Sequence, residues 1–306
     1  MAASPSGGAS PARRAARLAG HVTAGGRSRG HIAPQALAEQ VASLASTVRD
    51  RVAIVTGSSS GVGAATVRLL AARGCHVVVN FSRSKAPAEE VARQCEGHGV
   101  KVLLCQADVG SDEGCAKLVK ETVDKFGRID LLVNNAGTTK FVSHENLEGL
   151  TSEDFHRIYG INAVGAFNMI KLCAPHMRKG GGGRVVNVSS AAGACHTVGS
   201  SVAYLMSKAA LNALTAAMGK ALGPEIVVNA VCPGFIAGEW LREGMGPEVY
   251  DYVKGNLEKK LPMRTVSQPE NVASAIVMLL EASSTHITGQ CIPCDAGLGL
   301  MRGPSL

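Results

Sequence analysis

Tyr204 and Lys208 are the two residues whose types and spacing most clearly indicate chemistry. They are four residues apart, so on a helix their side chains lie on one face. A free tyrosine has a pKa of about 10, and a cation nearby favours the phenolate and lowers that pKa. The pair could therefore give a proton to an oxygen atom, with Lys208 tuning Tyr204 as a general acid. A surface pair without a chemical role is the alternative that these two residues leave open.

A glycine-rich segment, Thr56–Gly63, reads TGSSSGVG and is the second chemical feature. It follows an apolar run at 52–56 and precedes a stretch with helical spacing. Glycine permits a tight turn, and the amino end of a helix offers unpaired N–H groups to an anion. Between a strand and a helix, the segment predicts a cradle for the pyrophosphate of a dinucleotide, with a purely structural turn as the alternative.

The elements that would position these residues begin at Arg51. From there, short apolar runs alternate with longer segments whose apolar residues recur at helical spacing, and Thr151 and Asp154 are spaced as in a capping box. This alternation predicts an α/β, doubly wound Rossmann fold: a seven-stranded parallel sheet with helices on both faces. The expected strands are 52–56, 76–81, 101–105, 129–133, 184–188, 226–231 and 290–294, and the expected helices are 62–73, 86–98, 111–126, 152–178, 202–222 and 269–281.

Three motifs occur in order along the chain. They are TGxxxGxG at 56–63, Asn134-Asn135-Ala136-Gly137 after the fourth expected strand, and Tyr204-Leu-Met-Ser-Lys208 after the fifth. With these motifs the chain resembles the short-chain dehydrogenase/reductase family, including its 3-oxoacyl-[acyl-carrier-protein] reductases and general carbonyl reductases. The resemblance covers residues 51–299. It implies an NAD(P)-dependent oxidoreductase that moves a hydride to or from a carbonyl carbon.

The resemblance also implies the catalytic residues Asn162, Ser190, Tyr204 and Lys208. Ser190 would bind the substrate oxygen; it is chosen over its neighbour because Gly193 completes an S-x-x-G pattern. Asn162 resembles the family asparagine that holds a proton-relay water, and Lys208 would also bind ribose hydroxyls. Ser190 lies 14 residues before Tyr204, one more than is common in relatives, which predicts a bulged loop.

The cofactor contacts follow from the same resemblance. Asp108 with Val109 resembles an adenine contact, and Gly238 stands where relatives often carry a threonine that binds the carboxamide. The residues implied to bind the cofactor are Gly57, Ser59, Ser60, Gly61, Val62, Gly63, Asn80, Ser82, Arg83, Asp108, Val109, Asn135, Ala136, Gly137, Tyr204, Lys208, Pro233, Gly234 and Ile236.

The choice between NADP and NAD depends on the end of the second strand, which reads Asn80-Phe81-Ser82-Arg83. An acid there would bind the ribose 2′-hydroxyl and repel a 2′-phosphate, and none is present. Asn80, Ser82 and Arg83 could instead receive the phosphate. Ser60 argues the other way, because NADP-preferring relatives often carry a basic residue at that place. We expect NADP as the preferred cofactor and NAD as the alternative.

The segment at about 235–262 resembles the family's substrate lid, and here it is apolar and aromatic. Together with Phe141 after the fourth strand, it predicts a pocket for an apolar ketone or aldehyde, or for an acyl chain of a thioester. The expected helices 152–178 and 202–222 are long and rich in small residues. In relatives such helices build the subunit interface, so we expect a homodimer or homotetramer.

Composition and charge argue against several other classes of protein. The 306 residues are 46% apolar with a net charge of +7, and beyond residue 50 the charges of both signs are interspersed. This is not the charge pattern of a nucleic-acid surface, and no apolar run reaches the about 18 residues of a membrane span. The nine cysteines, an odd number, indicate reduced thiols, and the lone pair Cys291 and Cys294 has no metal-binding partners, so we expect no metal.

Residues 1–50 are predicted to be a flexible basic extension of the single domain 51–306. They hold six arginines against two acids, which is typical of a transit peptide; a disordered extension is the alternative. We expect a soluble intracellular protein, cytoplasmic unless the extension directs it to a mitochondrion or plastid.

The leading hypothesis is NADP(H)-dependent reduction of a ketone, aldehyde or 3-oxoacyl carbonyl to an alcohol, with Tyr204 as proton donor. An NAD-dependent alcohol dehydrogenase of the same family is the alternative. A non-catalytic dinucleotide-binding scaffold is the alternative of another class, and the full set of Asn162, Ser190, Tyr204 and Lys208 argues against it.

Overall fold

A computed structural model describes residues 47–194, 199–284 and 286–301. Most of the predicted extension, residues 1–46, lies outside this part of the chain. The described fold begins slightly earlier than predicted, because Val48 is buried in the core and Thr47 Oγ1 accepts a hydrogen bond from Ala282 N at 2.7 Å.

A seven-stranded parallel sheet forms the centre of the fold, in the order β3-β2-β1-β4-β5-β6-β7. The predicted Rossmann fold is therefore confirmed. The order reverses between β1 and β4, where sheets of this kind bind their ligands. The strands are β1 (Val52–Val55), β2 (His76–Phe81), β3 (Val102–Gln106), β4 (Leu131–Asn134), β5 (Gly183–Val188), β6 (Ile226–Pro233) and β7 (Cys291–Cys294).

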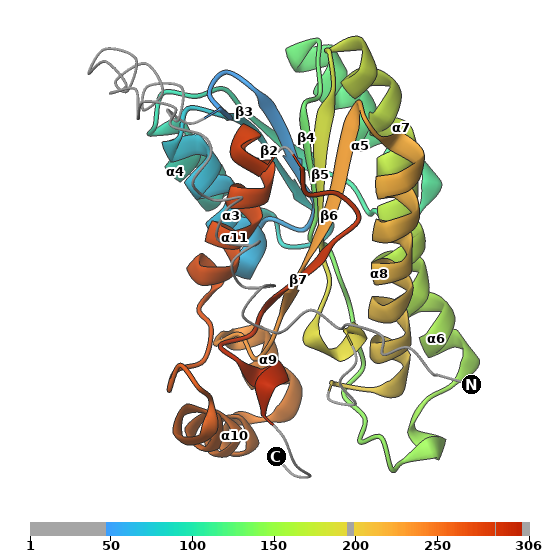
Figure 1. Cartoon of the computed structure of the whole chain (residues 1–306), viewed down its shortest axis with the longest axis vertical. Helices are drawn as coiled ribbons and strands as arrows, with labels where there is room; N and C mark the ends of the chain where they lie inside the picture. The colour runs from blue at the N-terminus through green and yellow to red at the C-terminus, as the bar shows by residue number, and fades with distance from the viewer. Residues whose placement is uncertain (1–46, 195–198, 285, 302–306) are drawn as a thin grey trace, which may run out of the picture. The chain divides into compact units, whose positions relative to one another are not determined.

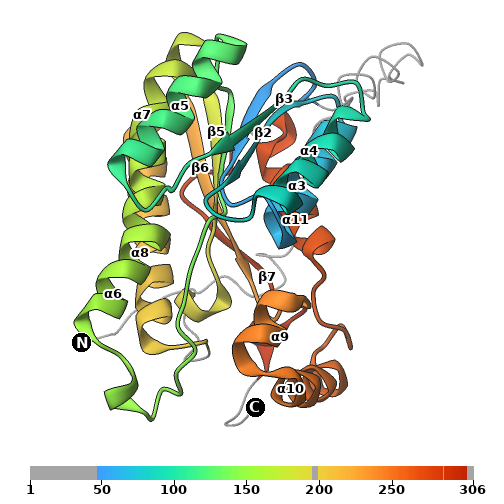
Figure 2. The same cartoon turned by 180° about the vertical axis from the view of Figure 1, so that it is seen from behind.

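Helices cover both faces of the sheet (Figure 1 and, from behind, Figure 2). Successive side chains of a strand point to opposite faces, so Ile54 and Val55 enter two different cores. Both cores are aliphatic, which explains why the strands read as continuous apolar runs. One face carries α3 (Gly61–Ala72), α4 (Lys85–Glu96) and α11 (Pro269–Leu280), and the other carries α5 (Asp112–Phe126), α7 (Gly165–Lys179) and α8 (Val202–Leu222).

The predicted helix 152–178 is interrupted. It consists of α6 (Ser152–Tyr159), a π-helical turn at Gly160–Val164, and α7. The predicted capping box opens α6: Thr151 Oγ1 accepts from Asp154 N, and Asp154 accepts from Thr151 N. Wide turns of this kind are common at functional sites, and this one contains Asn162.

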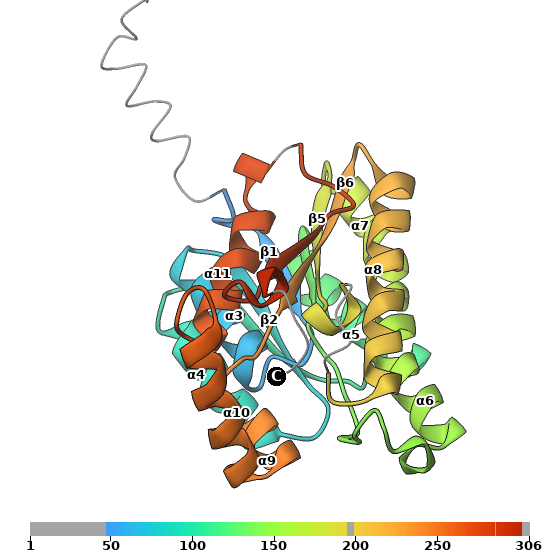
Figure 3. The ribbon, with the colours of Figure 1, turned by 60° about the horizontal axis from the view of Figure 1, so that its bottom comes forward.

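Two helices occupy the predicted lid, α9 (Glu239–Met245) and α10 (Pro247–Lys260), and they lie beside the carboxyl end of β7 (Figure 3). Gly246 separates them at φ +83°, a backbone conformation that favours glycine, and Pro247 suits the first turn of α10. A small apolar cluster that includes Leu257, Leu261 and Val266 packs beneath them. The short 3₁₀ turns are Leu147–Gly149, Ala191–Gly193, Ala282–Ser284 and Leu298–Leu300.

Candidate active site

Tyr204 and Lys208 lie on one face of α8, as their spacing predicts. Ser201 caps the helix, because its Oγ accepts a hydrogen bond from Tyr204 N at 3.3 Å. Lys208 Nζ lies 5.7 Å from the centroid of the Tyr204 ring and donates to Val188 O, at the end of β5, at 2.8 Å. The register of α8 therefore holds both side chains at the carboxyl end of the sheet.

Burial shifts the pKa values of these two groups in opposite directions. It raises the pKa of Tyr204 to about 12, an effect that a hydrogen bond with Ser190 opposes, and it lowers the pKa of Lys208 to about 8. The expected acidification of Tyr204 is therefore wrong for the protein alone. Loss of water around the phenolate is the largest cause of the raised pKa, and the hydrogen bond with Ser190 offsets only part of it. At neutral pH Tyr204 keeps its proton and Lys208 is mainly charged.

Ser190 is positioned beside Tyr204 by the turn that follows β5. Its Oγ accepts from Ala192 N at 3.1 Å and caps the turn Ala191–Gly193. A Cβ added at Gly193 would lie 2.5 Å from Lys208 C, so a glycine is needed for the turn to pack on α8. Ser189 Oγ instead donates to Lys208 O at 3.2 Å. Residues 195–198 of the loop that is predicted to bulge lie outside the described residues.

Asn162 reaches the same space from the π-helical turn. Its Oδ1 accepts from Thr138 N at 2.8 Å, and its Nδ2 donates to Thr138 O and to Ser207 Oγ, each at 2.9 Å. A Cβ added at Gly137 would lie 3.4 Å from Asn162 Oδ1 and 3.7 Å from Lys208 Nζ, so both groups face this glycine. Because both amide N–H bonds of Asn162 are used within the chain, the arrangement favours a positioning role; the proton-relay water stays a prediction.

Sequence reasoning missed Ser207. It is fully buried, accepts from Asn162 and donates to Tyr204 O at 2.7 Å, so it connects the π-helical turn to the helix that carries the tyrosine. The available signal was a serine just before Lys208 in a helix whose neighbouring positions are mostly apolar.

The glycine-rich turn joins β1 to α3 and packs against the segment after β4. Gly57 has φ +60°, and a Cβ there would lie 2.9 Å from Ala136 Cα. Asn135 Nδ2 donates to Thr56 O and Gly57 O, each at 2.9 Å. Gly61, at φ +53°, has open space around its missing side chain. The amino end of α3 therefore remains accessible to an anion, and the residues fit a pyrophosphate.

Asn80, which is predicted as a phosphate ligand, makes its side-chain hydrogen bonds within the protein. Its side chain is buried, its Oδ1 accepts from Gly57 N at 3.0 Å, and its Nδ2 donates to Cys105 O and Ala107 O. All of these bonds hold the glycine-rich turn on the sheet, so Asn80 positions the turn. Ser82 and Arg83 are exposed just beyond β2 and remain candidates for a 2′-phosphate.

The remaining predicted cofactor residues lie at strand ends. Asp108 is exposed after β3 and its Oδ1 accepts from Gly110 N at 2.9 Å, whereas Val109 is buried. Pro233 ends β6. Gly234 packs against Asp295, because a Cβ added at Gly234 would lie 3.0 Å from Asp295 Cβ. Of the other predicted positions, Ser59 and Ser60 lie in the turn before α3, Val62 and Gly63 lie in the first turn of α3, and Ile236 follows β6.

The described residues contain neither a metal-binding cluster nor a helix that could span a membrane. In residues 47–194, 199–284 and 286–301, no three His, Cys, Asp or Glu side chains gather as a metal site would require. Within the same ranges no helix has the length and apolar character needed to cross a bilayer. Cys291 and Cys294 are free thiols on β7.

The fold and this site fit an oxidoreductase of the Rossmann class, and the comparisons with known proteins agree. The family model described as Enoyl-(Acyl carrier protein) reductase matches residues 56–299. The 3-oxoacyl-[acyl-carrier-protein] reductase of Synechocystis is 34% identical over 81% of this chain and 96% of its own length. A Streptomyces violaceoruber protein named as a ketoacyl reductase of granaticin polyketide synthesis is 37% identical over 82% of this chain and 96% of its own.

Solved structures of similar proteins also belong to oxidoreductases. A mutant short-chain dehydrogenase/reductase from Serratia marcescens superposes with a TM-score of 0.74 at 32% identity, over 82% of this chain and 98% of that one. An acetoin dehydrogenase from Salmonella typhimurium has a TM-score of 0.72 at 29% identity, with the same coverage. The chain belongs to the short-chain dehydrogenase/reductase family and is an oxidoreductase.

Proposed function

We propose that the chain is a carbonyl reductase that uses NADPH to reduce a ketone, an aldehyde or a 3-oxoacyl group to the alcohol. The observation that carries the proposal is the convergence of Ser190, Tyr204 and Lys208 at the carboxyl end of the sheet. Residues 135–137 connect this cluster to the glycine-rich turn, since Ala136 packs on Gly57 and Gly137 faces Lys208.

The geometry suits proton donation to a carbonyl oxygen. The side chain of Ser190 lies close enough to Tyr204 to oppose the rise of the tyrosine pKa. Each hydroxyl has one proton, so with a substrate bound both would turn from each other to donate to its oxygen. The raised pKa of Tyr204 keeps the phenol protonated until the oxygen gains negative charge. Once the proton has moved, the nearby ammonium of Lys208 stabilises the phenolate that remains.

The protein would hold the cofactor along the strand ends. When bound, the nicotinamide supplies the hydride that the carbonyl carbon accepts. Ser60 and Gly61 at the amino end of α3 would bind the pyrophosphate, and Asp108 would face the adenine. Lys208 would bind ribose hydroxyls, and Pro233 would border the nicotinamide.

The preference for NADPH is supported by the exposed Ser82 and Arg83 beyond β2 and by the lack of an acid there. The 2′-phosphate would pair with Arg83 in a charge-assisted contact. We expect Arg83→Asp to lower the NADPH-to-NADH ratio of kcat/KM by at least about tenfold, because an acid repels the phosphate and suits a 2′-hydroxyl. Arg93→Asp, on the exposed face of α4, is the matched control. An unchanged ratio in steady-state assays would refute the role of Arg83.

An NAD-dependent alcohol dehydrogenase working in the oxidative direction is the second candidate. It is favoured by the similarity to an acetoin dehydrogenase and by the uncharged Ser60 in the glycine-rich turn. Cofactor preference separates the two candidates, since the first requires faster turnover with NADPH and the second with NAD.

The experiment that tests the proposed function is a panel of ketones, aldehydes and 3-oxoacyl thioesters. Oxidation of NADPH and of NADH by the full chain is followed for each compound. We expect carbonyl-dependent oxidation that is faster with NADPH. Oxidation with none of the compounds, by a folded protein that binds NADPH, would contradict the proposal.

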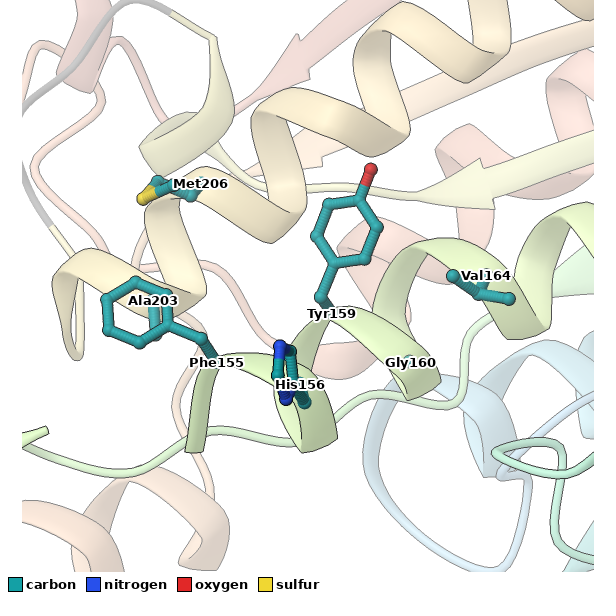
Figure 4. A pocket seen from close by; sticks show the side chains of 7 residues that line it. All are labelled: Phe155, His156, Tyr159, Gly160, Val164, Ala203 and Met206. Atoms are coloured by element: carbon teal, nitrogen blue, oxygen red, sulfur yellow. The ribbon is translucent and has the colours of Figure 1, made fainter. Parts of the chain in front are cut away.

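We also propose a homodimer or homotetramer built on the outer face of α6 and α8. A pocket of about 410 Å³ lies there (Figure 4). Tyr159, Val164 and Met206 line it and are 47%, 43% and 51% exposed. Contiguous exposed apolar surface of this kind is typical of a protein–protein contact.

A further inference from the structure

Three aromatic rings from different segments meet beside the proposed proton donor. Trp240 of α9 lies with its ring centroid 6.4 Å from that of Tyr204, tilted by 48°. The ring of Phe141, from the segment after β4, also lies near this indole, with the centroids 5.6 Å apart and a tilt of 60°. Both are favourable geometries for aromatic pairs. Trp240 is nevertheless 51% exposed, so much of the indole remains free to contact a ligand.

The backbone of α9 fixes this arrangement. Trp240 and Gly244 are four residues apart and share one face of the helix. A Cβ added at Gly244 would overlap the ring of Phe141, so Phe141 packs directly on the helix backbone. The indole thus packs near both Phe141 and Tyr204.

The two cations that stand closest to Phe141 and Trp240 in the sequence are already paired. Lys140, next to Phe141, donates to Asp154 Oδ2 at 2.7 Å. Arg242, two residues after Trp240, bonds Asp251 Oδ1 at 2.9 Å and lies 5.5 Å from the ring of Tyr250. An anionic group seated on the indole would therefore compete with existing ion pairs, whereas an uncharged flat group would bury apolar surface on both partners.

We propose that Trp240 is the specificity-determining residue of this site and selects carbonyl compounds that carry a flat, uncharged aromatic or conjugated ring on the carbonyl carbon. This inference rests on the proposed carbonyl reduction and names its substrate class. The ring of the substrate packs on the indole while the carbonyl oxygen faces the Tyr204 hydroxyl. Phe141 and Gly244 are positioning residues that act through Trp240.

The test compares acetophenone with cyclohexyl methyl ketone, which place a flat and a puckered six-membered ring on the same carbonyl. We expect kcat/KM to favour acetophenone by about three- to tenfold, the range that aromatic pairing supports. Trp240→Ala should bring the ratio close to one, and Trp240→Phe should keep most of it. Gly244→Ala should lower the ratio mainly through KM, because it displaces Phe141. Met278→Ala, on the distant α11, should leave the ratio unchanged.

A binding measurement covers the case in which a variant does not fold. Trp240 is the one tryptophan of the chain, so its emission reports on this site. We expect the product 1-phenylethanol to change the emission of the wild-type protein with cofactor at lower concentration than 1-cyclohexylethanol. Equal effects of the two alcohols would contradict the inference.

Different results would overturn the proposed carbonyl reduction and the proposed selectivity of Trp240. No carbonyl-dependent turnover by the wild type would overturn carbonyl reduction and this inference with it. Turnover with the same ratio in the wild type and in Trp240→Ala would overturn the inference alone. So would faster turnover of a straight-chain 3-oxoacyl thioester that Trp240→Ala leaves unchanged.

Discussion

At the scale of single residues, the site places a phenol that keeps its proton beside an ammonium whose pKa is lowered. Tyr204 has a pKa of about 12 and Lys208 a pKa of about 8, and burial is the first cause of both shifts. With this pKa Tyr204 is protonated throughout the usual assay range, so its proton can leave only as negative charge develops on the substrate oxygen. Of these two groups, Lys208 is the one whose charge changes in the pH range of ordinary assays.

This gives a pH dependence with a definite sign. Because the pKa of Lys208 is lowered, its ammonium is present below about pH 8 and is lost above it. We expect kcat/KM for carbonyl reduction to be level near neutrality and to fall as pH rises through about 8. Lys208→Met should lower kcat/KM at every pH and remove this transition. A transition of the same pKa in Lys208→Met would show that another group causes it.

Residue types and spacing predicted the shared helix face of Tyr204 and Lys208, because four residues make about one helical turn. They did not predict the direction of the tyrosine pKa shift, since that depends on how much water the folded protein excludes. The positioning role of Asn80 was not predictable for a similar reason. Its position suggested a ligand contact, but its hydrogen bonds to Gly57 and to the chain after β3 appear only once the strands pair.

At the scale of elements, close backbone contacts position the site. The turn after β5 packs on α8 at Gly193, where an added Cβ would lie 2.5 Å from Lys208 C and 2.7 Å from Ala209 N. Neither atom is the end of a flexible side chain. Ser190 can therefore stay beside Tyr204 only if this turn keeps its close packing on the backbone of α8.

We expect Gly193→Ala to lower the free energy of unfolding by about 1–3 kcal/mol, the usual cost of overpacking, and to lower kcat. Gly255→Ala is the matched control, because it lies within α10 with open space around it. Alanine there should be neutral or stabilising by up to about 1 kcal/mol. Urea denaturation measures both variants. Equal effects of the two substitutions would contradict the packing argument.

The regular elements were largely predictable, because buried parallel strands are continuous apolar runs and amphipathic helices keep their period. The interruption of 152–178 was not, since helical spacing looks the same on both sides of a π-helical turn. Nor were α9 and α10. Gly238, Gly246 and Pro247 mark turns in the sequence, but they do not show that the short segment between the glycines forms a helix.

At the scale of the whole molecule, the outer face of α6 and α8 remains apolar and exposed. Its pocket is lined by residues from both helices, including Phe155, Tyr159 and Met206 (Figure 4). The sequence predicted association through these helices from their length and small residues. Which side chains stay exposed could be read only after α6 and α8 were packed against each other.

Charge placed on this face should separate the subunits. We expect Tyr159→Glu and Met206→Glu to shift the protein from a dimer or tetramer to a monomer, because an unpaired acid in an apolar contact costs several kcal/mol. Ala86→Glu, on the exposed side of α4, is the control and should not change the mass. Light scattering after size-exclusion chromatography measures it. A wild-type monomer at micromolar concentration would contradict the proposed interface.

The central claim is that Tyr204 gives the proton to the substrate oxygen, and Tyr204→Phe tests it most directly. The substitution removes the hydroxyl and keeps the ring that contacts Trp240. We predict that kcat/KM for the best carbonyl compound falls by about 10²- to 10⁴-fold, the usual contribution of general acid catalysis, and that the dissociation constant for NADPH changes far less. Turnover within a few-fold of the wild type would show that another group supplies the proton.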